Sequence, residues 1–130
     1  MKLRIRGNSL RLRLTRREVA HIGEGLRVEE AIEFGAEPDQ RLTYALEASN
    51  AVTCITAHFR DNQITVYLPM NLAKEWAVTD TISLRDEQAL PQGGTTLKLL
   101  VEKDFACLTD RRGTDDEDTF SHPMQGSMRC

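Results

Sequence analysis

Apolar and polar residues alternate with a period of two along the start of the chain. Residues 2–6 and 10–14 each alternate leucine or isoleucine with lysine or arginine. This alternation is typical of strands that bury one of their two faces. Gly7 and Asn8 separate the two runs, and both residue types tolerate a positive φ. The pattern therefore predicts a tight hairpin over residues 2–14.

A short helix and two further strands are predicted for the rest of the first half. Thr15 and Glu18 have the Thr-x-x-Glu spacing of a capping box, in which each side chain bonds the other residue's amide. The apolar stripe that follows ends at Gly23, and glycine is common where helices end. Residues 28–34 and 41–48 have the composition of strands, and the GAEPDQ segment between them is typical of a turn.

The second half of the chain repeats this order of elements. Strands are predicted at 53–60, 63–68, 81–84 and 96–101, and a helix is predicted to begin at Pro69. A shift of 54 residues aligns Arg6 with Arg60, Asn8 with Asn62, Leu10 with Ile64, Leu12 with Val66, Leu14 with Leu68, Ile22 with Trp76 and Val28 with Ile82. The agreement of element order, turn position and apolar spacing indicates an internal repeat.

Neither half has enough strands to close a core alone. We therefore expect the halves to bury one another's apolar faces. The predicted fold is mainly β with two short helices, a single-chain pseudo-dimeric barrel of two strand–strand–helix–strand–strand units. Residues 1–108 are assigned to this barrel, with halves of about 1–50 and 51–108. From about Thr109 the periodicity stops, so residues 109–130 are interpreted as an acidic tail.

Composition excludes several classes of protein. The 130 residues are enough for one domain, and no apolar run reaches the roughly 18 residues of a membrane-spanning helix. The first residues lack the uninterrupted apolar stretch of a secretory signal. Cys54, Cys107 and Cys130 are widely spaced, with no Cys-x-x-Cys pair that would suggest a disulfide framework or a zinc site. We therefore expect a cytoplasmic protein without membrane contact, metal or other cofactor.

Charge is distributed unevenly along the chain. Seven lysines and arginines fall within the first 17 residues, with no acid among them. Residues 115–118 are a continuous acidic run, and the formal net charge of the whole chain is −3. The net charge therefore hides a basic beginning and an acidic end.

The segment RIRGNSLRLRLTRREVAHIGEGLRVEEAIEF resembles the opening of AbrB/MazE-type swapped-hairpin proteins, with the Arg-Gly-Asn-Ser turn at residues 6–9. NQITVYLPMNLAKEWAV resembles the same unit again, through the strand-to-helix junction at Leu68-Pro69. The resemblance covers about residues 2–103. The whole chain also resembles a small bacterial family of unassigned function that opens with a similar arginine-rich hairpin.

The resemblance implies a DNA-binding regulator or antitoxin. Proteins of this type usually interleave hairpins from two chains, so a chain with both halves implies a pseudo-dimer. In these proteins basic residues around the first hairpin contact DNA. Carried over by position, the nucleic-acid-binding candidates are Arg4, Arg6, Asn8, Arg11 and Arg13.

The basic hairpin has two interpretations. A two-residue turn sets Arg4 opposite Arg11 and like charges opposite one another destabilise a hairpin, so a polyanion such as DNA would relieve the repulsion. Alternatively, the arginines pair with acids on a neighbouring strand, such as Glu29 and Glu33.

The acidic tail also has two interpretations. The resemblance implies that a flexible acidic segment wraps a toxin-like protein, and the partner-binding candidates are then Asp115, Asp116, Glu117, Asp118 and Phe120. The alternative is a solvating tail, or a tail folded back onto the basic hairpin.

No motif in the sequence points to catalysis. Cys107 and His122 could meet as a nucleophile and its base, but no third orienting group accompanies them. We expect a non-catalytic binding protein. The alternatives are a protein-interaction module and, with least support, an enzyme that uses a cleft between the halves.

Overall fold

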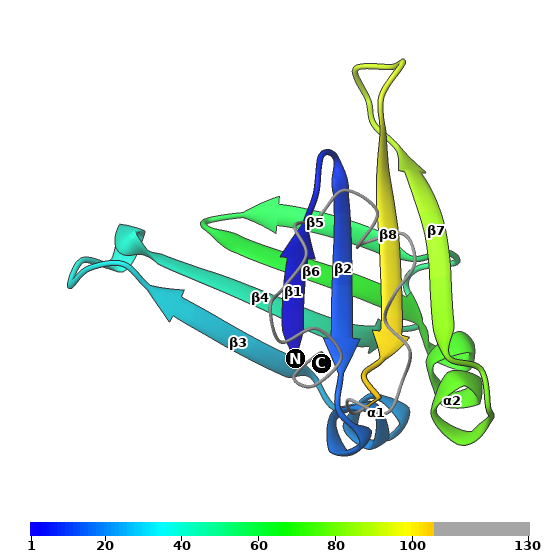
Figure 1. The fold of residues 1–130 in the computed structure, drawn as a ribbon. Coiled ribbons are helices and arrows are strands. Elements are labelled where there is room, and N and C mark those ends of the chain that lie inside the picture. The colour runs from blue at the N-terminus through cyan, green and yellow to red at the C-terminus, as the bar shows by residue number, and fades with distance from the viewer. Residues whose placement is uncertain (106–130) are drawn as a thin grey trace, which may run out of the picture.

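Four β-hairpins and two short helices form the fold in a computed structural model that describes residues 1–105 (Figure 1). The elements are β1 (Lys2–Ile5), β2 (Ser9–Leu14), α1 (Arg16–Gly23), β3 (Val28–Glu33), the 3-10 turn η1 (Pro38–Gln40), β4 (Arg41–Ser49), β5 (Thr56–Arg60), β6 (Gln63–Pro69), α2 (Met70–Val78), β7 (Ser83–Ala89) and β8 (Thr96–Lys103). None of the helices within residues 1–105 has the length and apolar character needed to cross a membrane.

The two halves of the chain exchange their hairpins. Hairpin β1–β2 of the first half joins hairpin β7–β8 of the second half in one sheet, in the order β1-β2-β8-β7. Hairpin β3–β4 joins hairpin β5–β6 in the other sheet, in the order β3-β4-β6-β5. The seams are the parallel pairs β2–β8 and β4–β6, whereas every hairpin is antiparallel. Each sheet therefore contains one hairpin from each half.

Equivalent strands of the two halves pair in the same register. Leu3 pairs with Leu12 in the first hairpin, and Ala57 pairs with Val66 in its counterpart, so both strands are shifted by 54 residues. In the later hairpins Val28 pairs with Leu46 and Leu84 pairs with Val101, which raises the shift to 56 and 55 residues.

The sequence alignment was therefore wrong at one pair. Val28 is 7% exposed and corresponds to the buried Leu84, whereas Ile82 is 49% exposed. The physical reason is that four residues separate Gly23 from Val28, whereas six separate the equivalent residues Ala77 and Leu84, so a constant shift cannot apply beyond the helix.

A single apolar core lies between the two sheets and the helices. Its members come from every hairpin and both helices, and the largest fully buried side chains are Trp76, Leu12, Leu14, Ile22, Leu46, Leu68, Val66 and Val101. Corresponding positions are buried to a similar extent, as Ile22 and Trp76 show with exposures of 0% and 1%. The expectation that each half covers the other's apolar faces is confirmed.

Helices α1 and α2 contact one another at the pseudo-two-fold axis that relates the two halves. Thr15 and Glu18 form the predicted capping box at the start of α1, and α1 ends at Gly23. A Cβ placed on Gly23 would lie 2.5 Å from the Cβ of Ala77 on α2. Residues 23 and 77 are themselves equivalent under the shift of 54, so the pseudo-two-fold axis passes between them.

The first hairpins of the two halves have the predicted two-residue turns. Gly7 and both residues of the Asp61-Asn62 turn have positive φ, which suits the twist of tight hairpins. The side-chain amide of Asn8 donates to the carbonyl of Thr96 over 2.7 Å, and that of Asn62 donates to the carbonyl of Asp39 over 3.1 Å. Each turn therefore ties its hairpin to the partner half.

The fold class is confirmed as mainly β with two short helices, and two details differ. Residues 1–105 form two open four-stranded sheets rather than one closed barrel. Strand β7 runs over Ser83–Ala89, beyond the predicted 81–84, because its later residues pair in register with β8 although they are mostly polar. The tail assigned to 109–130 lies outside the described residues.

The sheets also touch along their edges. The amide of Ile55, just before β5, donates to Asp86 Oδ2 on β7 over 3.1 Å. Gln88 then accepts from the amide of Ala57 over 2.7 Å and donates to its carbonyl over 3.2 Å. At the equivalent edges, the amino group of Met1 donates to Glu30 Oε2 on β3 over 2.6 Å. A carboxylate therefore bridges each pair of edges at one point, Asp86 on one side and Glu30 on the other, and Gln88 adds two further bonds at the β5–β7 edges.

Candidate functional site

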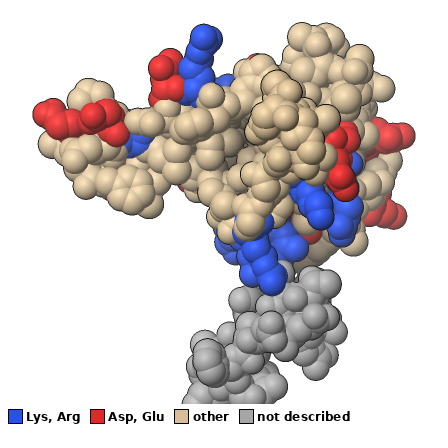
Figure 2. All heavy atoms as spheres, turned by 90° about the horizontal axis from the view of Figure 1, so that it is seen from above, with Lys and Arg blue, Asp and Glu red and all other residues tan. Residues whose placement is uncertain are grey.

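Cations gather on the outer face of the sheet β1-β2-β8-β7. Apolar residues of these strands point to the core, so the alternate positions point to solvent. Those positions carry the cations that we call the basic face: Lys2, Arg4, Arg6, Arg11, Arg13, Arg85 and Lys98. Figure 2 shows lysines and arginines clustered at the bottom of the view, where the front of the molecule in Figure 1 lies.

The strand register sets these cations in rows across the sheet. Arg4 on β1 lies opposite Arg11 on β2, as the hairpin interpretation predicted. Arg11 lies beside Leu100 on β8, and Leu100 lies beside Arg85 on β7. One row therefore crosses all four strands and carries three arginines around a single half-buried leucine.

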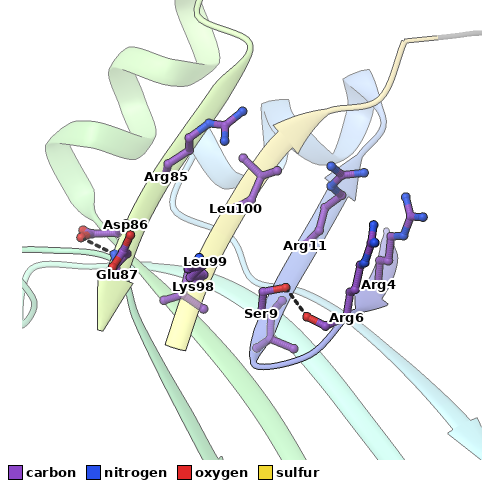
Figure 3. Close-up of a pocket in the computed structure, with 11 residues that line it drawn as sticks. Arg4, Arg6, Ser9, Arg11, Arg85, Asp86, Glu87, Lys98, Leu99 and Leu100 are labelled. Carbon is purple, nitrogen blue, oxygen red and sulfur yellow. Dashed lines mark hydrogen bonds between the residues drawn. The ribbon is translucent and has the colours of Figure 1, made fainter. Parts of the chain in front are cut away.

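This row lines a half-open hollow of about 400 Å³. Its cationic lining is Arg4, Arg6, Arg11, Arg85 and Lys98. Figure 3 shows Arg4, Arg6 and Arg11 on one flank of the hollow and Arg85 on the other, with Leu100 between them. Asp86 and Glu87 also line it, and Asp86 uses one carboxylate oxygen for the amide of Ile55. The hollow joins residues from both halves of the chain.

Acids of the neighbouring strand pair with part of the basic face. Glu102 Oε1 on β8 lies 2.6 Å from Arg13 Nε and 3.6 Å from Arg11 Nε. Lys2 Nζ lies 3.0 Å from Asp104 Oδ2. Pairing within the protein was one of the two interpretations, and it accounts for the end of the face nearest the helices.

The acids named for that pairing were wrong. Glu29 Oε1 lies 2.9 Å from Arg27 Nε, and Glu33 Oε2 lies 3.6 Å from Arg41 Nη1, both on the other sheet. The sequence suggested them because they belong to the next strand along the chain. The hairpin exchange places β8, rather than β3, beside β2.

Arg27, which lies just before β3 of the other sheet, is held differently. Arg27 is bound by Glu29 and by Glu47, whose Oε1 lies 2.6 Å from Arg27 Nη1. Burial on its own lowers the pKa of Arg27, but the hydrogen bonds to Glu47 and Glu29 outweigh it and raise that pKa above its ordinary value. This arginine is committed to two carboxylates of its own sheet.

Two members of the basic face were not foreseen. Arg85 lies in a segment whose apolar alternation stops after Leu84, since the next two core-facing residues are Asp86 and Gln88. Lys98 was placed in a strand but not connected with the N-terminal hairpin. Both join the basic face through pairing between strands about 90 residues apart. In the sequence, only the internal repeat could have indicated this pairing, if it had been interpreted as an exchange of hairpins.

The remaining candidates contribute little to this site. The side-chain amide of Asn8 donates to the carbonyl of Thr96, and the DNA-binding role of Asn8 stays a prediction. Within residues 1–105, no three His, Cys, Asp or Glu side chains form a group suited to a metal ion. The tail candidates and the Cys107–His122 pair lie outside the described residues: Asp115, Asp116, Glu117, Asp118 and Phe120.

Comparison with known proteins gives one match. A family model described as a family of unknown function (DUF7009) matches residues 1–124. No curated protein and no solved structure matches the chain. The match spans both hairpin pairs and both helices, so it covers the basic face in full.

Proposed function

The chain belongs to this family of unknown function, and we propose that it is a non-catalytic protein that binds duplex DNA by its phosphates on the basic face. The observation that carries the proposal is the row of Arg4, Arg11 and Arg85 around Leu100. These arginines come from both halves, so the exchange of hairpins extends a basic hairpin into a basic surface.

The dimensions of the surface suit a phosphate backbone. Neighbouring strands lie about 4.8 Å apart, so the row from Arg4 to Arg85 spans roughly 14 Å. The next row, with Lys98, lies two residues further along the strands, or about 7 Å away. Guanidinium groups bind phosphate oxygens through two parallel hydrogen bonds. Two rows of cations therefore offer contacts to several phosphates at once.

The residue types favour phosphate contact over base contact. Proteins that read unpaired bases stack them on aromatic side chains. The outward positions of β1, β2, β7 and β8 are arginine, lysine, serine, threonine, alanine, glutamate and leucine, with no aromatic residue among those described. We therefore expect binding that depends weakly on base sequence and strongly on salt. The resemblance to AbrB/MazE-type proteins, whose first hairpin contacts DNA, points to the same partner.

A charge reversal on the basic face tests the proposal. Arg85→Glu removes one cation of the central row, and Arg60→Glu makes the same change on the outer face of the other sheet. We expect Arg85→Glu to weaken binding of a labelled duplex at least tenfold in fluorescence anisotropy at low salt. It should also lower the slope of log affinity against log salt by about 1.

The control separates a site from general charge. Arg60→Glu changes the net charge equally, so it should leave affinity within about twofold of the parent protein. Equal losses in the two variants would mean that only net charge matters, and the basic face would not be a site. The proposal is also overturned if the parent protein does not retain duplex DNA at low salt.

A further inference from the structure

We propose that the outer edge of β1, at Leu3 and Ile5, is a docking site for an extended peptide whose residues alternate between acidic and apolar. Such a peptide would add a fifth strand to the sheet beside β1. This inference concerns the edge of the sheet rather than its outer face, and it does not depend on DNA binding.

The main-chain groups of β1 point outward at two positions. The amide of Arg6 donates to the carbonyl of Ser9 over 3.2 Å, which closes the turn. Bonded and non-bonded pairs alternate along an antiparallel hairpin. Arg4 therefore bonds with Arg11, whereas the N–H and C=O groups of Leu3 and Ile5 point away from β2. Strand β1 is the outermost strand of its sheet among residues 1–105, so these groups face the edge.

The equivalent edge in the second half is closed by a side chain. Ala57 on β5 corresponds to Leu3, and its outward N–H and C=O groups both bond to Gln88 on β7. The register places Ile32 on β3 at the position that corresponds to Gln88. An isoleucine side chain has no hydrogen-bonding group. Gln88 therefore satisfies the outward main-chain groups of β5, whereas Ile32 cannot do the same for the equivalent groups of β1.

The two sides of β1 specify the occupant. Lys2, Arg4 and Arg6 project on its outer side, where directly opposite acids in an added strand would be stabilising. Ile5, on its inner side, is 60% exposed, and Ile32, which occupies on β3 the position equivalent to Gln88, is 46% exposed. Apolar residues of an added strand would cover them. A second copy of β1 is a poor occupant, because its own cations would lie opposite these cations.

The test uses a labelled, end-blocked peptide of the sequence Glu-Val-Glu-Val-Glu-Val. We expect it to bind in fluorescence anisotropy and to slow hydrogen exchange at the amides of Leu3 and Ile5. A control peptide has the same sequence but is methylated on the alternate amide nitrogens that would face β1. It lacks the N–H donors for the added strand but keeps the same charge. It should bind at least tenfold more weakly.

Two variants locate the site on the protein. Ile5→Pro removes an outward N–H without removing a bond to β2, and proline is tolerated on edge strands. We expect it to weaken peptide binding at least fivefold, while the equivalent Phe59→Pro has less than a twofold effect. Ile32→Gln copies Gln88 and should also weaken binding, because its amide would bond the groups that the peptide needs.

The results separate this inference from DNA binding. Arg85→Glu, on the far strand of the sheet, should lose DNA affinity but keep peptide affinity within twofold. The inference is overturned if the peptide does not bind, if the methylated peptide binds equally well, or if Phe59→Pro weakens binding as much as Ile5→Pro.

Discussion

The two sheets have closely similar inner faces and unlike outer faces. Val28 and Leu84 correspond and are 7% and 8% exposed, and Leu12 and Val66 correspond and are 1% and 2% exposed. On the outer faces the comparison ends. One sheet presents the basic face, whereas the other presents uncharged side chains together with charges of both signs, including Arg41 beside Glu33, and Arg27 next to it is held by two of its glutamates.

This difference shows that the fold constrains the residues of the inner faces and leaves those of the outer faces free to vary. The core needs a matching apolar side chain from each half, so the repeat is kept there. The outer faces point away from the core, so the packing of the core places few demands on them. A concentration of like charge on one of two equivalent surfaces opposes stability slightly, which is why we assign it to binding.

The largest expected effect tests the equivalence of the inner faces. Leu14 and Leu68 correspond, and each is 0% exposed. We expect Leu14→Ala and Leu68→Ala each to lower the free energy of unfolding by about 2–5 kcal/mol, through lost burial and the cavity left behind. Urea denaturation measures both. A large loss for one and almost none for the other would show that the halves do not share one core.

The next test addresses the contact between the helices. Gly23→Ala brings two Cβ atoms to 2.5 Å unless the helices move apart. We expect a loss of about 1–3 kcal/mol from overpacking, despite the higher helix propensity of alanine. The double variant Gly23→Ala/Ala77→Gly exchanges the two residues across the axis. Thermal unfolding should show it recovering most of the loss, and failure to recover would contradict the symmetric contact.

A smaller effect compares the starts of the two helices. The side chain of Thr15 caps α1, whereas no side chain caps α2, which begins after the corresponding residue, Pro69. We expect Thr15→Ala to lower the free energy of unfolding by about 1 kcal/mol. Thr15→Ser should retain most of the cap. Equal losses for alanine and serine in urea denaturation would indicate that the hydroxyl does not stabilise the helix.

The smallest expected effect on stability sharpens the comparison of the outer faces. Glu102→Gln removes the carboxylate that pairs with Arg13 and Arg11, and a partly exposed pair of this kind contributes less than about 1 kcal/mol. The same change frees positive charge, so we expect duplex affinity to rise a few-fold. Glu47→Gln, its counterpart on the other sheet, should not raise it. A rise in both variants would point to net charge alone.

The order of elements could be predicted from the sequence, because alternation, capping and turn residues are local signals. The Gly7-Asn8 hairpin and the Thr15–Glu18 capping box are confirmed in this way. Strand β7 was predicted too short, since Asp86 and Gln88 face inward and hide its alternation. These side chains are polar because they bond the backbone of β5 rather than fill the core.

The candidate site could be predicted only in part, for a reason of distance along the chain. Arg4, Arg6 and Arg11 are visible as a local cluster. Arg85 and Lys98 join them only after strands far apart in sequence have paired, and no local pattern contains that pairing. The same limit made Glu29 and Glu33 look like partners of the hairpin. They are close to the hairpin along the chain, but the exchange of hairpins places them on the other sheet.

The meeting of Gly23 and Ala77 has a consequence for how such a molecule can evolve. In a pair of identical chains, one gene position would supply both sides of the axis, so a methyl group there would always face its own copy. Joining the halves in one chain lets each side mutate alone. A glycine can then accommodate an alanine, and one surface can accumulate arginines while its counterpart carries charges of both signs.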